Sequence, residues 1–382
     1  MGKFKTIICI ALAVLLTVSC LAGCTGEEKE EFDVKKIVFT DEQVSDISNE
    51  IDGLIDSGIF YGGVSVMLNE NEVYKNYFGM ANQNGDPVNE DSEYLLSSAT
   101  MAFTAVAVQQ LVEDDKLSLS DTLGKYFDSN KYTYLNVVTV EDLLNASVSF
   151  VNYSSEMGRD GEEKDKLMKE ITSKKKRSGE KIKEMVEEHI LNNGVVSSDV
   201  ANSNYYILGR IIEKVSGMGY DEYLQKNIFD KLEMNHTGFV RLDQNAVGMN
   251  VKTKEWIQQS DNKPICNYSY LYSSYGGVST LDDMTRFYRA VLNKELCKTD
   301  IAKKALKKKK GFSYGFETDG KTLYICAGVN IHRVYVCINP ETEEITNVFT
   351  NTVGDSDISE LGNDIYRKVN AKINRMLLEN SD

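Results

Sequence analysis

The chain has 382 residues, 42% of them hydrophobic, which is enough to bury the core of one large domain or of a core domain with an inserted lobe. Acidic residues number 58 against 43 lysines and arginines, so the net charge is -15 at pH 7. This balance argues against a nucleic-acid partner, because phosphate backbones are bound by basic surfaces.

Residues 1–23 have the pattern of an export signal. Two early lysines are followed by an apolar run at 7–18 and by the sequence Leu-Ala-Gly-Cys, which ends at Cys24. This resembles the lipobox of bacterial lipoproteins, in which the signal is cut before a cysteine that then carries the lipid. An ordinary signal peptide and an uncleaved anchor are the alternatives. We expect an extracytoplasmic protein bound to the membrane through Cys24, with residues 24–40 as an acidic tether.

A helix and a strand pair are expected next. Residues 41–60 carry apolar side chains at helical spacing, and residues 62–68 and 73–77 flank a polar turn, which predicts a hairpin. Residues 94–111 begin apolar, pass two serines and continue as an apolar helix. A serine at such a helix start is either an ordinary N-cap or a nucleophile close to backbone N–H groups that stabilise an oxyanion.

The sequence Tyr-Leu-Leu-Ser-Ser-Ala-Thr-Met-Ala-Phe-Thr-Ala at 94–105 resembles the nucleophile segment of the penicillin-recognising serine hydrolases. That family includes serine β-lactamases, D-alanyl-D-alanine peptidases and related esterases. Its hallmark is Ser-x-x-Lys, with the lysine one helical turn after the nucleophile. Matching Phe-Thr-Ala at 103–105 to the family's motif puts Ser98 at the nucleophile and Met101 at the lysine.

The resemblance extends over residues 41–378. Segments similar to family motifs lie at 117–127, 138–147, 232–239 and 276–284. Helices are expected at 204–216, 220–232 and from 358 onward, and strands at 321–327, 332–339 and 344–351. The charge-dense stretch 161–177 is interpreted as a solvated insertion, with a patch for an anionic surface as the alternative.

The resemblance implies an α+β fold of the β-lactamase/transpeptidase type. An antiparallel sheet is flanked by terminal helices, and a mostly helical lobe is inserted into it. Residues 41–95 with 308–380 are expected to form the sheet lobe and residues 96–307 the helical lobe, together one domain. The site is expected at their junction.

The two remaining family motifs are also altered. Counting seven residues back from Gly209 puts Val200 at the tyrosine or serine of the second motif and Asn202 at its asparagine. In the third motif, Lys-Thr-Gly or His-x-Gly, Cys326 replaces the lysine or histidine and Gly328 is kept, which lets backbone approach the site.

All three replacements remove groups that move protons. A serine hydroxyl is a weak nucleophile without a base, and general-base assistance is worth roughly two to four powers of ten in rate. Methionine and valine accept no proton, and a thiol does not replace a persistent positive charge. The sequence therefore predicts a degenerate active site and favours a protein that is not an enzyme.

Cysteines and histidines offer other, weaker candidates. Besides Cys24, the mature chain keeps cysteines at four positions, namely Cys266, Cys297, Cys326 and Cys337. An oxidising compartment permits disulfides, so Cys326 and Cys337 either pair across a hairpin or remain buried thiols. Cys326 with His332 is a candidate thiolate–imidazole pair. The histidines lack metal-ligand spacing and no cofactor fingerprint is present, so we expect neither a metal nor a cofactor.

Three functions remain open. The first is a degenerate homologue that binds a peptide or cell-wall fragment without cleaving it. The second is a weak serine hydrolase of the esterase, D-alanyl-D-alanine peptidase or β-lactamase type, which uses Ser98 with a non-standard base. The third is a structural or interaction lipoprotein with a filled cleft. The sequence favours the first.

Overall fold

The computed structural model describes residues 40–55, 60–153, 179–196, 201–239, 247–250, 255–258, 268–329, 332–353 and 358–379. The export signal, Cys24, Val200, Cys266 and the charged stretch 161–177 lie outside the described residues. None of the helices in the described part is both long enough and apolar enough to cross a bilayer.

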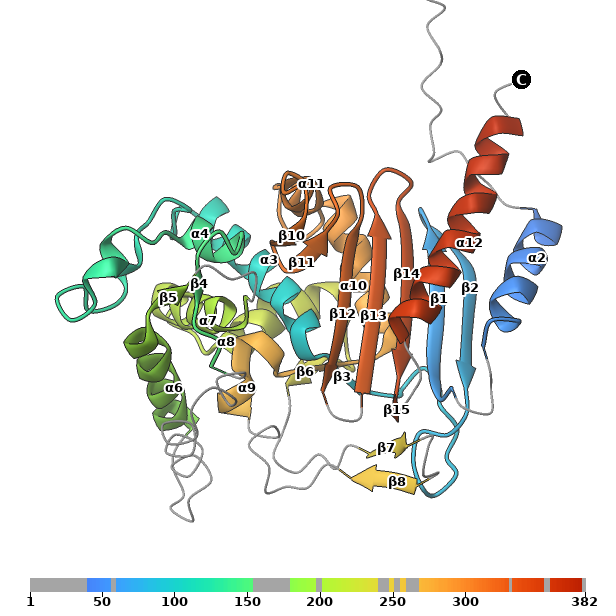
Figure 1. The fold of residues 1–382 in the computed structure, drawn as a ribbon, viewed down its shortest axis with the longest axis horizontal. Helices are drawn as coiled ribbons and strands as arrows, with labels where there is room; N and C mark the ends of the chain where they lie inside the picture. Colours follow the sequence, from blue (N-terminus) through green and yellow to red (C-terminus); the bar gives the residue numbers. More distant parts are fainter. Residues whose placement is uncertain are drawn as a thin grey trace, which may run out of the picture.

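A seven-stranded antiparallel sheet joins the two ends of the chain (Figure 1). Its strands, in spatial order, are β10 (Gly311–Ser313), β11 (Phe316–Thr318), β12 (Leu323–Val329), β13 (His332–Asn339), β14 (Glu344–Thr350), β1 (Gly62–Leu68) and β2 (Asn71–Phe78). Early strands β1 and β2 therefore complete a sheet whose other strands come late in the sequence. Local sequence patterns do not determine which strands pair over such a separation, because the pairing depends on long-range contacts.

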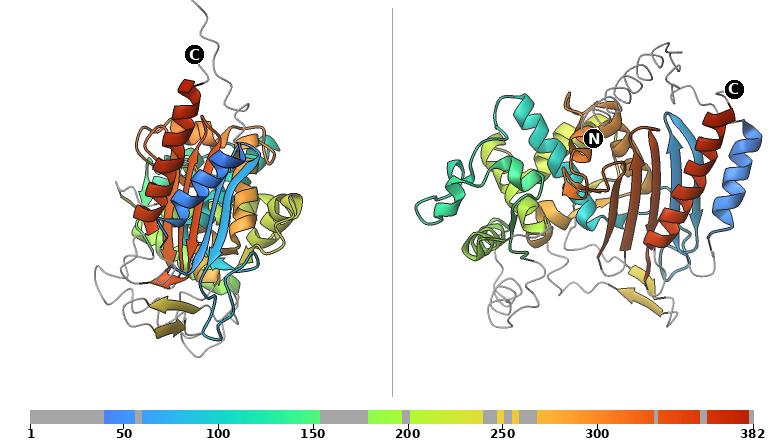
Figure 2. Two further views of the ribbon diagram at one scale, coloured as in Figure 1. Left: turned by 90° about the vertical axis from the view of Figure 1, so that its right-hand side faces the viewer. Right: turned by 45° about the horizontal axis from the view of Figure 1, so that its top comes forward.

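Helices cover both faces of this sheet. On one face, α12 (Ile358–Glu379) and α2 (Asp41–Asp52) lie side by side (Figures 1 and 2). On the other face, α10 (Leu281–Asn293) packs against β1 and β14. Every residue of β1 and β14 is buried, as expected for strands covered on both sides.

The helical lobe is built around α3 (Thr100–Glu113), whose first twelve residues are all buried. A helix that is apolar on every side belongs in a core. Around it pack α7 (Asn202–Ser216), α8 (Tyr220–Leu224) and α9 (Tyr268–Tyr275) (Figure 1). This places the start of α3 between the lobe and the sheet.

Shorter elements connect these parts. The helices are α4 (Val140–Leu144), α6 (Gly179–Asn193) and α11 (Ile301–Leu306), with single turns at η2 (Ser97–Ala99), η3 (Leu123–Lys125) and η4 (Thr133–Asn136). The small sheets are β3 (Tyr94–Leu95) with β9 (Gly277–Ser279) and β6 (Gly238–Phe239), β4 (Ser149–Phe150) with β5 (Val195–Val196), and β15 (Thr352–Val353) with β7 (Val247–Asn250) and β8 (Glu255–Gln258).

Local sequence signals coincide with three helix ends. Thr139 and Asp142 form a capping box, Thr280 caps α10, and Gly217 ends α7 in a left-handed conformation. Two expectations differ in detail. The helix expected at 41–60 ends at Asp52, and the helix expected at 220–232 runs through one π-helical and one 3-10 turn after α8.

Candidate functional site

Ser98 lies in the turn η2, between β3 and α3. Ser97, directly before it, has a positive φ of 50°, and its hydroxyl donates a hydrogen bond to the Gly328 carbonyl at 3.4 Å. Backbone strain in a non-glycine residue costs about 1–3 kcal/mol and concentrates at functional sites. The strained residue therefore precedes the position at which the sequence predicts the nucleophile.

A small cavity of about 160 Å³ opens at Ser98. It is lined by Ser98, Met101, Ala201, Asn202, Phe312, Gly315, Glu317, Tyr324, Ile325 and Cys326. Four of the six motif positions predicted from the sequence thus line one cavity, although they are up to 228 residues apart. Gly328 lies next to it through the bond from Ser97, and Val200 lies outside the described residues.

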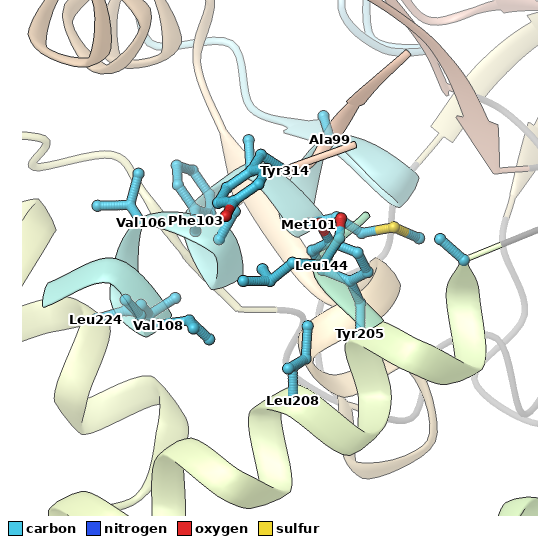
Figure 3. Packing of buried hydrophobic residues seen from close by; sticks show 14 of the residues in the cluster. Ala99, Met101, Phe103, Val106, Val108, Leu144, Tyr205, Leu208, Leu224 and Tyr314 are labelled. Carbon is cyan, nitrogen blue, oxygen red and sulfur yellow. Dashed lines mark hydrogen bonds between the residues drawn. The ribbon is translucent and has the colours of Figure 1, made fainter. Parts of the chain in front are cut away.

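Met101, which the sequence alignment matches to the family's lysine, is 1% exposed and packs into the apolar core. The same buried cluster contains Leu144 and Tyr205 (Figure 3). Tyr205 donates its hydroxyl to the Leu144 carbonyl at 3.1 Å, and Tyr206 donates to the Ser269 carbonyl at 2.6 Å. Both tyrosines are fully buried and pack in the core, and burial raises their pKa well above the usual value.

Glu317 is a cavity residue that the sequence did not single out. It lies on β11 opposite Tyr324 of β12, and both side chains line the cavity. Partial desolvation raises the pKa of Glu317, and a hydrogen bond from Tyr324 partly offsets this shift. Within the described part of the chain, no side chain makes a hydrogen bond to the Ser98 hydroxyl. In the sequence, Glu317 could have been found only from its position on the strand that precedes the third motif.

Cys326 and His332 do not form the thiolate–imidazole pair that the sequence left as a minor alternative. Cys326 stands opposite Tyr335 in the β12–β13 ladder, whereas His332 stands opposite Val329. Because side chains alternate between faces along a strand, Cys326 and His332 project from opposite faces of the sheet. The buried His332 instead accepts a hydrogen bond at Nδ1 from the Leu95 N–H at 2.7 Å, which helps to hold the strand before Ser98.

Cys326 and Cys337 do not form a disulfide. Cys326 is exposed at the cavity, while Cys337 is buried on the neighbouring strand. Burial raises the pKa of Cys337 to about 12, and it does the same for Cys297. Among the described residues, no cluster of histidine, cysteine and acidic side chains could hold a metal ion.

Gly328 brings backbone close to the serine turn, since its carbonyl accepts the hydrogen bond from the Ser97 hydroxyl. A side chain at this position would meet the end of the Arg333 side chain, 2.5–2.6 Å away. Two other glycines make close contacts with α3. Gly277 donates its N–H to Thr100 at 3.0 Å, and Gly315 packs on the backbone of Ala102.

Comparisons with known proteins agree with this arrangement. The family model "Beta-lactamase" matches residues 48–370. A putative penicillin-binding protein of Bacillus subtilis, PbpX, is 24% identical over 90% of this chain and 84% of its own length. A teichoic acid D-alanine hydrolase of Staphylococcus aureus is 27% identical over 50% of this chain and 44% of its own length.

The fold is also shared with a solved structure. FmtA from Staphylococcus aureus superimposes with a TM-score of 0.67 at 19% identity, covering 86% of this chain and 90% of that one. An antiparallel sheet flanked by terminal helices, with the serine turn against β12, thus agrees with a β-lactamase/transpeptidase fold, as predicted. With a family model that spans residues 48–370, this chain belongs to the Beta-lactamase family of serine hydrolases.

Proposed function

We propose that this protein is a catalytically degenerate member of its family that binds a cell-wall-type ligand in the Ser98 cavity without cleaving it. The observation that carries the proposal is Met101. It occupies the position of the family's lysine, is 1% exposed, and lies among apolar side chains. A serine whose neighbour cannot accept its proton is a weak nucleophile.

The ligand class follows from the relatives' names. One relative is described as penicillin-binding and the other as acting on the D-alanine of teichoic acid. We expect the cavity, with Asn202 on one wall and β12 on the other, to accept a D-alanyl group or a short peptide that ends in one. The export pattern and Cys24 support an extracytoplasmic protein anchored to the membrane.

Covalent labelling tests the absence of turnover. The full chain in neutral detergent is incubated with a fluorescent penicillin and a fluorophosphonate, and adducts are read by intact mass, with Ser98→Ala as control. Folded protein is expected to give no stoichiometric adduct. An adduct that disappears in Ser98→Ala would show an activated serine and overturn the proposal.

Binding is tested by thermal unfolding in the presence of D-alanyl-D-alanine and of D-alanine esters. A ligand at one hundred times its Kd stabilises the folded state by about 2.7 kcal/mol. The expected rise in melting temperature should be lost when the cavity is filled by Ala201→Trp. If no such ligand shifts the wild-type transition, the third function, a structural or interaction lipoprotein, replaces this one.

One observation favours the second function, a weak hydrolase. Glu317 lines the same cavity as Ser98, and its pKa is raised, as is common for general bases. In that case fluorophosphonate labelling of Ser98 would occur, and it would fall at least about tenfold in Glu317→Gln. Labelling that is unchanged by this substitution would remove Glu317 as the base.

A further inference from the structure

Lysines are concentrated on one short segment of this acidic chain. Six lie within residues 303–310, namely Lys303, Lys304, Lys307, Lys308, Lys309 and Lys310, although the whole chain carries a net charge of -15. Within the described part of the chain, no carboxylate forms an ion pair with Lys303, Lys304, Lys307, Lys309 or Lys310. The positive charge of these five lysines is therefore available to a ligand.

Three of these lysines line a pocket of about 350 Å³ at the C-terminal end of α11. We call it the lysine pocket. Lys304, Lys307 and Lys308 form one side of it. Asn145, Ser147 and Tyr314 form the rest, together with Glu141 as the single acidic lining residue. The lining thus holds three ammonium groups against one carboxylate, with two hydroxyls and an amide beside them.

Neutral groups hold two of the ammonium groups in place. Lys308 donates to the carbonyls of Asn145 at 2.8 Å and of Phe312 at 3.0 Å. Lys304 lies 3.4 Å from the Tyr314 hydroxyl and 5.3 Å from the centre of its ring. Contacts with neutral acceptors orient an ammonium group without neutralising it. Pre-oriented donors lower the entropic cost of binding an anion.

Two acids offset part of this charge. Asp142, next to the pocket, accepts hydrogen bonds from Thr139 and Ser147 that lower its pKa, so it stays ionised at neutral pH. Glu141 is the single acidic residue of the lining. The six lysines of residues 303–310 outnumber these two acids, so an anion that enters the pocket meets net positive charge.

We propose that the lysine pocket binds a phosphodiester unit of an anionic polymer. A phosphate offers several acceptor oxygens to several ammonium donors at once, and charge-assisted bonds of this kind are the strong ones. The site is concave, which suits a single unit of a flexible chain, whereas a bilayer surface would meet the exposed lysines only from outside. Repeated phosphates would let the neighbouring units contact Lys307, Lys309 and Lys310.

The lysine pocket lies next to the Ser98 cavity. Both are lined by the turn and strands of the β10–β11 hairpin: Phe312 and Gly315 line the cavity, and Tyr314 lines the lysine pocket. A polymer held at the lysines could thus place a side group in the cavity. Binding at the lysine pocket, however, does not depend on any chemistry at Ser98.

The test uses the full chain in neutral detergent and a fluorescein-labelled glycerol phosphate oligomer, with fluorescence anisotropy as readout. Lys304→Gln/Lys307→Gln should raise the Kd at least tenfold. It should also reduce the slope of log K against log salt by about one to two, one per lost phosphate contact. The matched control is Lys226→Gln/Lys231→Gln, which removes the same charge from exposed positions of the helical lobe. The control should bind as the wild type does.

Three results would overturn the proposal. The wild type could fail to bind the oligomer at 50 mM salt. Both double variants could lose the same affinity, which would reveal a response to net charge alone. Vesicles of phosphatidylglycerol and phosphatidylcholine could displace the oligomer as well as unlabelled oligomer does at equal phosphate, which would make a membrane surface the partner. Adding Ser98→Ala separates the two proposals, because it should leave oligomer binding unchanged.

Discussion

Gly315 packs directly on Ala102: a Cβ atom on Gly315 would stand 2.6 Å from the Ala102 Cα and 3.0 Å from the Met101 carbonyl oxygen. This contact seats the β10–β11 hairpin on the first turn of α3, behind Ser98. Gly315 also has a φ of 89°, a conformation that side chains rarely adopt. Gly315 therefore lines the Ser98 cavity at the point where the hairpin packs on α3.

Gly315→Ala should destabilise the fold and loosen the cavity. We expect a loss of about 2–4 kcal/mol, the sum of backbone strain and overpacking, measured by urea unfolding. The control is Gly85→Ala, which has a φ of 86° and open space around it. It should lose only about 1 kcal/mol. Equal losses in both variants would mean that the contact with Ala102 contributes nothing.

Met101→Lys should restore part of the missing chemistry at a cost in stability. A lysine here enters an apolar environment, so we expect a loss of roughly 2–4 kcal/mol in urea unfolding. Labelling of Ser98 by a fluorophosphonate should rise about tenfold or more, since the new amine can accept the serine proton. Met101→Leu keeps the volume, should cost under about 1.5 kcal/mol, and should leave labelling unchanged. Labelling that stays at background in folded Met101→Lys would contradict the proposal that Ser98 is inactive because Met101 replaces the base.

Glu344 should make the protein less stable as the pH rises. This side chain is 0% exposed, and it accepts hydrogen bonds from Asn370 of α12 and from Thr346. Burial raises its pKa to about 8. Between about pH 4.5 and pH 8 the folded state therefore holds a proton that the unfolded state has released. The free energy of unfolding should fall by up to about 1.4 kcal/mol per pH unit over this window.

Glu344→Gln should remove most of that slope, because a neutral amide keeps the shape and does not titrate. Chemical unfolding at pH 5, 6.5 and 8 measures it, with the exposed Glu341→Gln as control. If wild type and Glu344→Gln respond to pH alike, the buried carboxyl group is not the source of the dependence.

The thiols should react at very different rates. Iodoacetamide modifies the thiolate, so the exposed Cys326 should react well before Cys337, whose pKa burial raises to about 12. We expect at least a hundredfold difference in rate, read by mass spectrometry of peptides, and its loss in urea. A ligand in the Ser98 cavity should slow Cys326 and leave Cys337 unchanged. Comparable native rates for the two thiols would contradict the burial of Cys337.

The sequence by itself determined the features that depend on near neighbours. The capping box at Thr139, the glycine end of α7 at Gly217 and the apolar character of α3 all depend on residues a few positions apart. The family resemblance also located Ser98, Met101 and Cys326, because it compares short motifs position by position. These three side chains line one cavity.

Other features depend on strand register and on the packing of segments that are distant in the sequence, and only the tertiary structure determined these. Register places Glu317 opposite Tyr324 and turns His332 away from Cys326, and a shift of one residue would reverse both. The lysine pocket likewise needs residues 141–147 and 304–314 to meet. Such contacts depend on the summed burial of whole faces over long separations in sequence, which no local pattern encodes.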